Sequence, residues 1–289
     1  MKKVTLADCR RHEFDGDPRW QESFYLGWVD RKNRACGANH ISLAPAGHRD
    51  THVWSWTMVE GKVVGRSQAH GIPMPEADYD DMKLDVLHVR SSDDPRNLDL
   101  GVDYGNGVSL DLQMRGYCDP VALSLDRGDV LLGDEHYEIM GGVTGTLSLP
   151  DQTIEVRASG WSDHSWGARD FSTNISHRWL FASFGPDFAI STFGFVSNEG
   201  YFPFGWVWDG GEVHLVTGAS FDAVVGDDGI SPRGCDARIE TETGRTYRVR
   251  GKSREAALMG GVGWHAMNGL TEFECAGRIG EGYLEVNEL

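Results

Sequence analysis

The sequence is poor in cysteine and has none in a paired motif. Its five cysteines lie far apart and no C-x-x-C pair occurs, which excludes a zinc knuckle and a thioredoxin-type redox pair. Scattered free thiols fit a reducing compartment, so we expect a cytoplasmic protein. The first residues lack the apolar stretch of a signal peptide, and no run reaches the length of a transmembrane helix.

Positive charge is scarce as well. Lys and Arg number 27 against 44 Asp and Glu, which gives a net charge of −17. Because this charge would repel a phosphate backbone or an anionic membrane surface, we expect neither nucleic acid nor a membrane as a partner. The chain also lacks a Gly-x-Ser-x-Gly elbow, a P-loop and a dinucleotide fingerprint, so hydrolase, phosphoryl-transfer and nicotinamide chemistry have no support.

What the chain does contain is strand-like alternation, with 37 glycines and 10 tryptophans. The alternation predicts hairpins at 53–65, 144–157 and 237–250 and a β meander at 178–216. Helical periodicity is confined to 254–259, where one or two turns are predicted. Short strands with frequent turn signals predict an all-β protein built from barrels or sandwiches.

The densest group of reactive side chains lies at 160–171, which read GWSDHSWGARDF. On a strand, Asp163 would face one way while His164 and Trp166 faced the other. A carboxyl or imidazole against indole rings is partly desolvated and can exchange protons near neutral pH, and the rings also stabilise a nearby cation. Arg169 could form a bidentate pair with a neighbouring Asp. The alternative is a buried polar network that only satisfies the backbone of a turn.

This segment resembles the Gly-x-x-Asp-His-Ser-Trp-Gly-x-Arg-Asp signature of the AttH-like, carotenoid 1,2-hydratase-like (hydroxyneurosporene synthase) superfamily. Glu138, Gly142 and Gly145 match the Glu-x-x-x-Gly-x-x-Gly stretch that precedes the signature in relatives. Residues 273–285, FECAGRIGEGYLE, resemble the closing Gly-Arg-x-Gly-x-Gly-x-x-Glu strand. The resemblance spans residues 130–289, and the first half matches only in general β character.

The resemblance implies an all-β fold of two lipocalin-like antiparallel β-barrel or half-barrel domains with an apolar cavity. We expect an N-terminal domain at 1–155 and a C-terminal domain at 156–289 that carries the signature. The resemblance also implies a hydratase, cyclase or pericyclic enzyme acting on hydrophobic small molecules, usually without a metal. Carried over by position, Asp163 and His164 form the proton-handling pair, in either order, and Trp166 is the wall that stabilises positive charge.

Aromatic and basic residues elsewhere are candidates for binding the substrate, with core packing as the alternative for the tryptophans. The predicted substrate-binding residues are Tyr25, Trp28, Trp54, Trp56, Arg169, His177, Trp179 and Trp206. His48, Asp50 and His52 would share one face of an extended segment and could seat a metal. The preceding glycine indicates a loop instead, and we predict no metal and no cofactor.

These observations lead to one hypothesis and two alternatives. The hypothesis is a cofactor-independent hydratase, dehydratase, isomerase or cyclase that acts by proton transfer on a small apolar substrate such as a terpenoid, steroid-like or aromatic alkene. The first alternative is a lipocalin-like binding protein for an apolar ligand, without chemistry. The second is a metal-assisted enzyme that uses His48 and His52. The sequence leaves a homodimer open.

Overall fold

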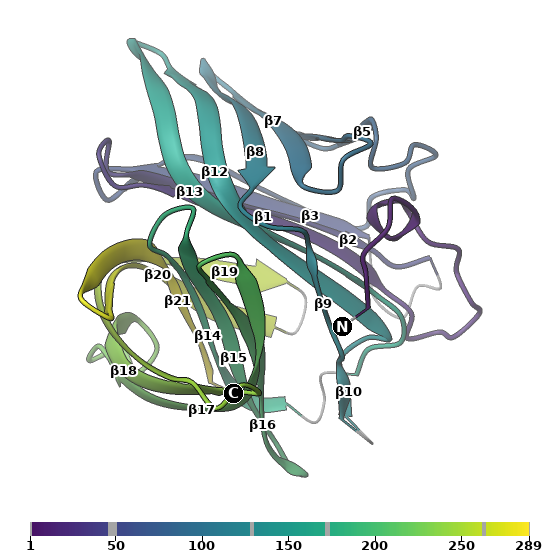
Figure 1. Cartoon of the computed structure of the whole chain (residues 1–289). Coiled ribbons are helices and arrows are strands. Elements are labelled where there is room, and N and C mark those ends of the chain that lie inside the picture. The colour runs from purple at the N-terminus through teal and green to yellow at the C-terminus, as the bar shows by residue number, and fades with distance from the viewer. Residues whose placement is uncertain (1, 46–50, 128–129, 171–173, 262–263, 289) are drawn as a thin grey trace. The chain divides into compact units, whose positions relative to one another are not determined.

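The chain forms two compact units, built almost entirely of strands (Figure 1). The first unit comprises Met1–Asp126 and Leu131–Arg169, and the second comprises Arg127–Val130 and Asp170–Leu289. The computed structural model describes residues 2–45, 51–127, 130–170, 174–261 and 264–288. Its described helical content is one 3-10 turn, Ala7–Cys9. Within these ranges no helix has the length and apolar character needed to cross a membrane.

The first unit is a curled antiparallel sheet that forms a half-barrel. Its described strands are β1 (Glu22–Asp30), β2 (Ala35–Leu43), β3 (His52–Val59), β4 (Lys62–Ala69), β5 (Met82–Leu84), β6 (Leu87–Ser91), β7 (Asn97–Gly105), β8 (Val108–Gly116), β9 (Val121–Leu123), β12 (Glu135–Leu149) and β13 (Gln152–Trp166). They follow the order β4-β3-β2-β1-β13-β12-β8-β7-β6-β5, and β9 pairs with β12. β13 therefore lies near the middle of the sheet, between β1 and β12. β10 (Asp126–Arg127) and β11 (Val130–Leu131) form a separate two-stranded sheet.

Burial along the strands shows which faces of this sheet are covered. In β8 the apolar residues Val108, Leu110 and Leu112 alternate with exposed or half-exposed ones, as expected for a strand with one face on the core. β1 is different, because all nine of its residues are buried. The part of the sheet around β1 and β13 therefore carries two buried faces, and each can hold functional groups.

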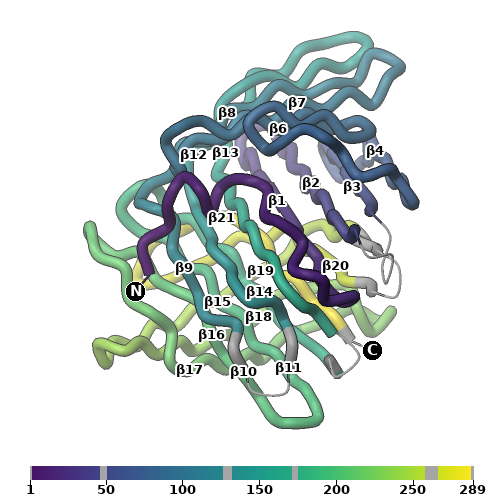
Figure 2. The backbone as a smooth tube through the Cα atoms, turned by 90° about the vertical axis from the view of Figure 1, so that its right-hand side faces the viewer, coloured from purple at the N-terminus to yellow at the C-terminus, as the bar shows by residue number. Residues whose placement is uncertain are grey.

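The N-terminal segment runs across the strands of the first unit before it enters β1, as the purple tube in Figure 2 shows. Isolated bridges join Lys3 to Val121 of β9, and Trp20 to Ala168 just beyond β13. The backbone N–H of Arg169 also donates to the carbonyl of Arg19 at 3.1 Å. These bonds hold an irregular segment against the signature strand.

The second unit is a closed antiparallel barrel. Its described strands are β14 (Asn174–Ser183), β15 (Phe188–Ser197), β16 (Gly200–Asp209), β17 (Glu212–Val225), β18 (Pro232–Thr241), β19 (Thr246–Gly261), β20 (Trp264–Cys275) and β21 (Arg278–Glu288). Each strand pairs with the next, and β21 pairs back with β14 to close the ring. The inward-facing residues, among them Leu180, Ile190, Ile239 and Leu284, form one buried apolar core.

The structure confirms the predicted all-β class and the barrel and half-barrel architecture. The predicted helical turns at 254–259 are wrong, because these residues lie in β19 and pair with β20. The division between the units lies at 169/170, whereas we expected it near residue 155. β12 and β13 pair without a break from Leu149↔Gln152 to Glu135↔Trp166, so the hairpin stays in one unit. The signature strand consequently belongs to the first unit.

Replacing Gly282 with alanine tests the closure of the barrel. A Cβ at this position would lie 1.7 Å from the carbonyl oxygen of Phe181, on the strand that closes the ring. Because backbone must move to relieve this clash, we expect Gly282→Ala to lower the free energy of unfolding by about 3 kcal/mol, measured by urea unfolding. Gly218→Ala is the matched control, since its Cβ would meet only the flexible end of Glu240 at 3.2 Å. Equal stability of the two variants would contradict the prediction.

Candidate active site

The signature residues lie on β13 and are paired on both sides. Asp163 is in register with Tyr25 of β1 and with Glu138 of β12. His164, the next residue, is in register with Tyr137 of β12. Because successive side chains of a strand point to opposite faces, Asp163 and His164 face opposite sides of the sheet. The structure therefore does not bring the predicted proton-handling pair together on one substrate.

Each of the two faces has its own character. One, which we call the core face, packs into the apolar core of the half-barrel and carries His164 together with Phe24, Leu26 and Ile139. The other, which we call the aromatic face, carries buried aromatic residues that lie outside that apolar core cluster. Its residues are Tyr25, Trp54, Trp56, Trp161 and Asp163.

Aromatic rings contact one another across the aromatic face. The ring of Tyr25 lies 5.8 Å from that of Trp54 in an edge-on arrangement and 6.4 Å from that of Trp161 in a stacked one. The imidazole of His40 stacks on Trp54 at 5.2 Å. Trp161 lies over Gly27, where a Cβ would come within 2.3 Å of the indole, so glycine there is what lets the ring lie flat on the sheet. The result is a band of π faces along this side of the sheet, in which Tyr25 is paired in register with Asp163.

Two buried carboxyl groups occupy neighbouring positions on this face. Asp163 and Glu138 are both buried and are paired in register on β13 and β12, where side chains lie about 5 Å apart at the Cβ atoms. His136 Nε2 lies 3.2 Å from a carboxylate oxygen of Glu138. Arg169 donates to the hydroxyl of Ser165, two residues after Asp163 on the same side of β13. Paired carboxyls of this kind suit general acid–base chemistry.

On the core face, His164 belongs to a buried polar network. Its Nε2 lies 2.8 Å from Glu22 Oε1, and its Nδ1 lies 3.3 Å from the hydroxyl of Tyr137. The same oxygen of Glu22 lies 2.9 Å from Nδ1 of His12. Trp166 stacks on His12 at 3.6 Å with the rings 12° from parallel. Trp166 is therefore on the side of His164 and opposite Asp163, as the alternation of side chains along a strand predicts, and its role in stabilising positive charge stays a prediction.

Burial and hydrogen bonding shift the pKa values of Glu22 and His164 in this network. Burial alone would raise the pKa of Glu22, but hydrogen bonds from His12 and His164 outweigh it and hold that pKa below its usual value. Burial lowers the pKa of His164, and the hydrogen bond to Glu22 opposes that effect only in part. Glu22 is thus kept ionised, and the hydrogen bond between Glu22 and His164 fixes the position of both side chains.

A small cavity adjoins His164. Its volume is about 20 Å³, which is enough for one water molecule. Its polar lining includes Tyr79, Tyr137 and His164, and its apolar lining includes Leu98 and Ile139. The hydroxyl of Tyr79 is buried and has no hydrogen-bond partner within the described part of the chain. This cavity fits a water molecule but not an apolar substrate of several rings.

The predicted substrate-binding residues of the first unit lie partly on the aromatic face and partly in the apolar core. Tyr25, Trp54 and Trp56 share the aromatic face with Asp163. Arg169 also lies on that side through its bond to Ser165. Trp28 lies in the apolar core of the half-barrel and is fully buried there, which favours the alternative of core packing.

The remaining predicted residues belong to the second unit. Trp206 and Trp179 alternate along their strands with Val207 and Leu180 of the barrel core, so they lie on the outer face of the barrel wall. Trp179 lies 5.1 Å from the ring of Phe193. His177 lies on the same outer face, with its Nε2 2.7 Å from Glu285 Oε1. Asn268 donates to the other carboxylate oxygen of Glu285 at 2.9 Å.

Sequence reasoning missed Glu22 and His12 as members of the site. The sequence contained a signal for Glu22. Alternate residues of this strand share one face, and Glu22 precedes the apolar residues Phe24, Leu26 and Trp28 on the face that packs into the core. A charge at such a position needs a partner of its own. His12 carries no such signal, since it lies in an irregular segment and reaches β1 only through the fold.

Of the three metal ligands considered from the sequence, His48, Asp50 and His52, the structure describes only His52. His48 and Asp50 lie outside the described residues. His52 is buried, with its ring 5.6 Å from that of His40 and 5.4 Å from that of His70. A different group offers closer atoms: one ligand atom each from His12, Glu22 and His164 lie within 4.8 Å of one another.

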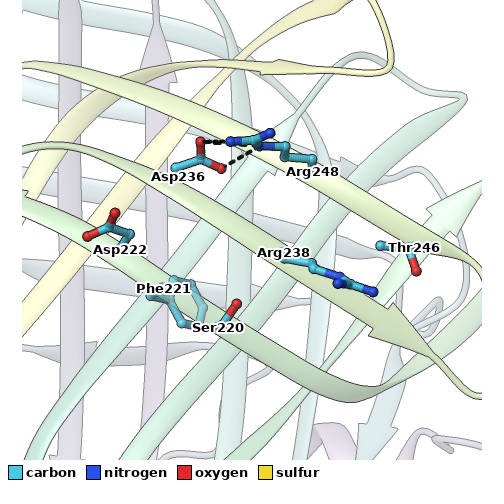
Figure 3. Close-up of a pocket in the computed structure, with 7 residues that line it drawn as sticks. All are labelled: Ser220, Phe221, Asp222, Asp236, Arg238, Thr246 and Arg248. Atoms are coloured by element: carbon cyan, nitrogen blue, oxygen red, sulfur yellow. Dashed lines mark hydrogen bonds and ion pairs between the residues drawn. The ribbon is translucent and has the colours of Figure 1, made fainter.

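A larger groove lies on the barrel of the second unit and is polar (Figure 3). Its volume is about 530 Å³, and its lining includes Asp222, Asp236, Arg238 and Arg248. The carboxylate of Asp236 accepts two hydrogen bonds from the guanidinium of Arg248, which lowers the pKa of Asp236. Charged walls of this kind do not suit an apolar substrate.

The comparisons with known proteins cover nearly the whole chain. A family model described as "Domain of unknown function (DUF7064)" matches residues 5–289. No curated protein sequence matches significantly. Among solved structures, the chain is similar to a candidate AttH protein from Nitrosomonas europaea, with 14% identity, a TM-score of 0.68 and coverage of 99% of both chains.

Two further solved structures share this fold. Kievitone hydratase from Nectria haematococca has 13% identity and a TM-score of 0.67, over 92% of this chain and 88% of the other. CghA, solved with Sch210972, has 12% identity and a TM-score of 0.69, over 94% and 89%. The predicted resemblance to AttH-like proteins is confirmed by this likeness of fold.

The imidazole of His40 gives a test of how dry the aromatic face is. Burial holds the pKa of His40 well below its usual value, and the positive charges of His52 and Arg169 add to the effect. The unfolded chain therefore binds a proton below about pH 6.5 that folded His40 does not. We expect stability to fall as the pH drops below 6.5, with His40 contributing up to about 1.4 kcal/mol per pH unit.

Urea unfolding of the wild type and of His40→Gln between pH 5 and 8 checks this expectation. The curve of the variant should be shallower below pH 6.5, because the other titrating groups are common to both proteins. At pH 8 His40 is neutral in both states, so the difference there measures only the packing cost of the substitution. Parallel curves from pH 5 to 8 would show that His40 is not desolvated.

Proposed function

The chain belongs to the family of the "Domain of unknown function (DUF7064)", and from this premise we propose that it is an enzyme that transfers a proton to a double bond of a small hydrophobic molecule. Asp163 is the proton donor and the aromatic face is the substrate surface. The product is the hydrated alkene or, where the cation loses a proton from a neighbouring carbon, an isomer. Where a second double bond of the substrate attacks the cation before that proton is lost, the product is a cyclised compound.

The observation that carries the proposal is the position of one buried carboxyl among aromatic rings. Asp163 lies on the face formed by Tyr25, Trp54, Trp56 and Trp161, within the stretch 160–165 of β13 that is buried on both sides. Protonation of an alkene creates a carbocation, and aromatic π faces stabilise a cation over their centres. A carboxyl is an effective proton donor in such surroundings.

The chemical steps need only protons and water. The carboxyl of Asp163 gives its proton to one alkene carbon, and the π electrons form the new C–H bond. Water adds to the cationic carbon through an oxygen lone pair, and Glu138, at the paired position on β12, takes the proton that this water loses. Return of that proton from Glu138 to Asp163 restores the starting state. Removing a proton from a neighbouring carbon in place of water addition gives the isomer.

The network on the core face has a positioning role in this proposal. Glu22 and Tyr137 hold both nitrogens of His164, and His164 is adjacent to Asp163 on β13. Fixing the one residue fixes the strand that presents the other. His164 thus acts through the backbone and does not touch the substrate.

The relatives support the reaction class by analogy of fold alone. Kievitone hydratase is, by its name, an enzyme that adds water to kievitone, and CghA was solved with Sch210972. Both share this fold over most of the chain. A hydratase or cyclase on the same scaffold agrees with a carboxyl that faces aromatic rings.

Isotope incorporation tests the proposed reaction. We expect the purified protein to convert at least one member of a panel of kievitone, aromatic alkenes, steroid-like alkenes and terpenoid alkenes. In H₂¹⁸O, hydration adds one labelled oxygen to the product, and in D₂O isomerisation adds one deuterium, both detected by mass spectrometry. Recovery of every ligand unchanged, together with tight binding, would support the alternative of a binding protein.

Substitution of Asp163 assigns the proton donor. Asp163→Asn keeps the shape of the side chain but cannot give up the proton, so we expect turnover to fall by about 10²–10⁴-fold, with an unchanged circular dichroism spectrum. Glu155→Gln is the matched control, because Glu155 is an exposed carboxylate on the same strand, paired with Arg157. Loss of activity in both variants, or in neither, would contradict the assignment.

Trimming an aromatic ring tests the substrate surface. Trp54→Phe removes part of the π surface beside Tyr25 while leaving an apolar ring. Because an aromatic contact contributes about 0.5–1.5 kcal/mol beyond burial, we expect KM to rise by about 2- to 10-fold with kcat changed less. The comparison variant is Trp28→Phe, since Trp28 packs in the apolar core and should change stability more than KM.

A further inference from the structure

We propose that His12, Glu22 and His164 form a binding site for one divalent transition-metal ion, on the core face of β13. The three residues come from three separate parts of the first unit: the N-terminal segment, β1 and β13. One ligand atom from each lies within 4.8 Å of the others. This site is on the opposite face of the strand from Asp163. It shares Glu22 and His164 with the network that positions the strand in the proposed reaction, but metal binding there can be measured without a substrate.

The convergence of both imidazoles on one oxygen is the main observation. Nε2 of His164 and Nδ1 of His12 lie 2.8 and 2.9 Å from the same atom, Glu22 Oε1. Ligand bonds to zinc are about 2.0–2.1 Å long for histidine nitrogen and about 2.0–2.2 Å for carboxylate oxygen. Two ligand atoms of one ion therefore lie about 3 Å apart, and the two distances to Glu22 already have this length.

The charge at the site also favours a cation. The carboxylate of Glu22 is fully buried, and its ion-pair partners within the described residues are the two imidazoles. A buried carboxylate requires a compensating positive charge. Either one imidazole carries a proton, or a metal ion takes the place of that proton and binds both rings in their neutral form.

The surroundings hold the ligands as second-shell groups do in metalloproteins. Tyr137 bonds to Nδ1 of His164, the nitrogen that is not aimed at Glu22. The backbone N–H of His12 donates to Glu22 at 3.2 Å, and Trp166 stacks on the ring of His12. Fixing the second nitrogen and the ring plane is how outer groups orient a metal-binding histidine.

The choice of ion follows from the ligand set. Two histidines and one carboxylate bind Zn²⁺ or Fe²⁺ and leave further positions for solvent. His12 has 20% of its side chain exposed, which gives an ion a route into the site. Bound there, the ion would tie the irregular N-terminal segment to the two central strands of the sheet.

Metal titration of the full chain tests the proposal. Protein treated with EDTA and desalted is titrated with ZnCl₂ by calorimetry and with CoCl₂ by visible absorption. We expect one ion per chain, ligand-field bands of Co²⁺ stronger than those of the free ion, and competition between the two metals. The absence of binding by both methods would overturn the proposal.

A substitution that keeps the ring separates ligation from packing. His12→Phe retains the stacking on Trp166 but has no ligand nitrogen, and we expect Zn²⁺ affinity to fall by more than about 10-fold, the least that loss of a second-shell partner costs. His88→Phe is the matched control, because His88 also lies beside a carboxylate, Asp81, but elsewhere in the unit. Unchanged affinity in His12→Phe would overturn the site, as would loss of binding in His52→Phe in its place.

Discussion

The two-residue period of β13 is the constraint from which the functional architecture follows. Hydrogen bonding to β1 and β12 fixes the register of this strand from Gly160 to Ser165, and a strand so paired cannot rotate to bring neighbouring side chains together. Asp163 and His164 therefore enter two different environments although they are adjacent in sequence. One is a surface of aromatic rings, and the other is an apolar core that contains the buried acid Glu22.

Glu22 is the buried acid of the apolar core, and its contacts organise the polar network there. A carboxylate inside a half-barrel core would be costly without partners, and His12, His164 and the backbone N–H of His12 supply them. The same contacts tie the irregular N-terminal segment to the two central strands. The polar network thus links local chemistry to the shape of the first unit, whether a proton or a metal ion balances the charge.

Several features of the fold could be predicted because they depend on local pattern. The hairpin at 144–157 combines alternating residues with a Pro-Asp turn, and Trp54 and Trp56 share a face through parity alone. We expected the boundary near residue 155, whereas β13 continues its pairing with β12 to Trp166. The length of this pairing could not be predicted from local pattern, because it depends on partners far away in sequence. The helical turns at 254–259 were predicted from composition, whereas the barrel requires a strand there to pair with β20. The role of His12 had no local signal, since its contact with β1 exists only after the chain folds.

The pairing of β21 with β14 has a consequence for synthesis on the ribosome. The edge of β14 stays open until residues 278–288 have left the exit tunnel, and β1 likewise waits for β13, more than 120 residues later. At about 5–20 residues per second, each nascent sheet exposes an unfinished edge for several seconds. Translation speed over these two stretches therefore sets how long the growing chain depends on chaperones to avoid pairing with other chains.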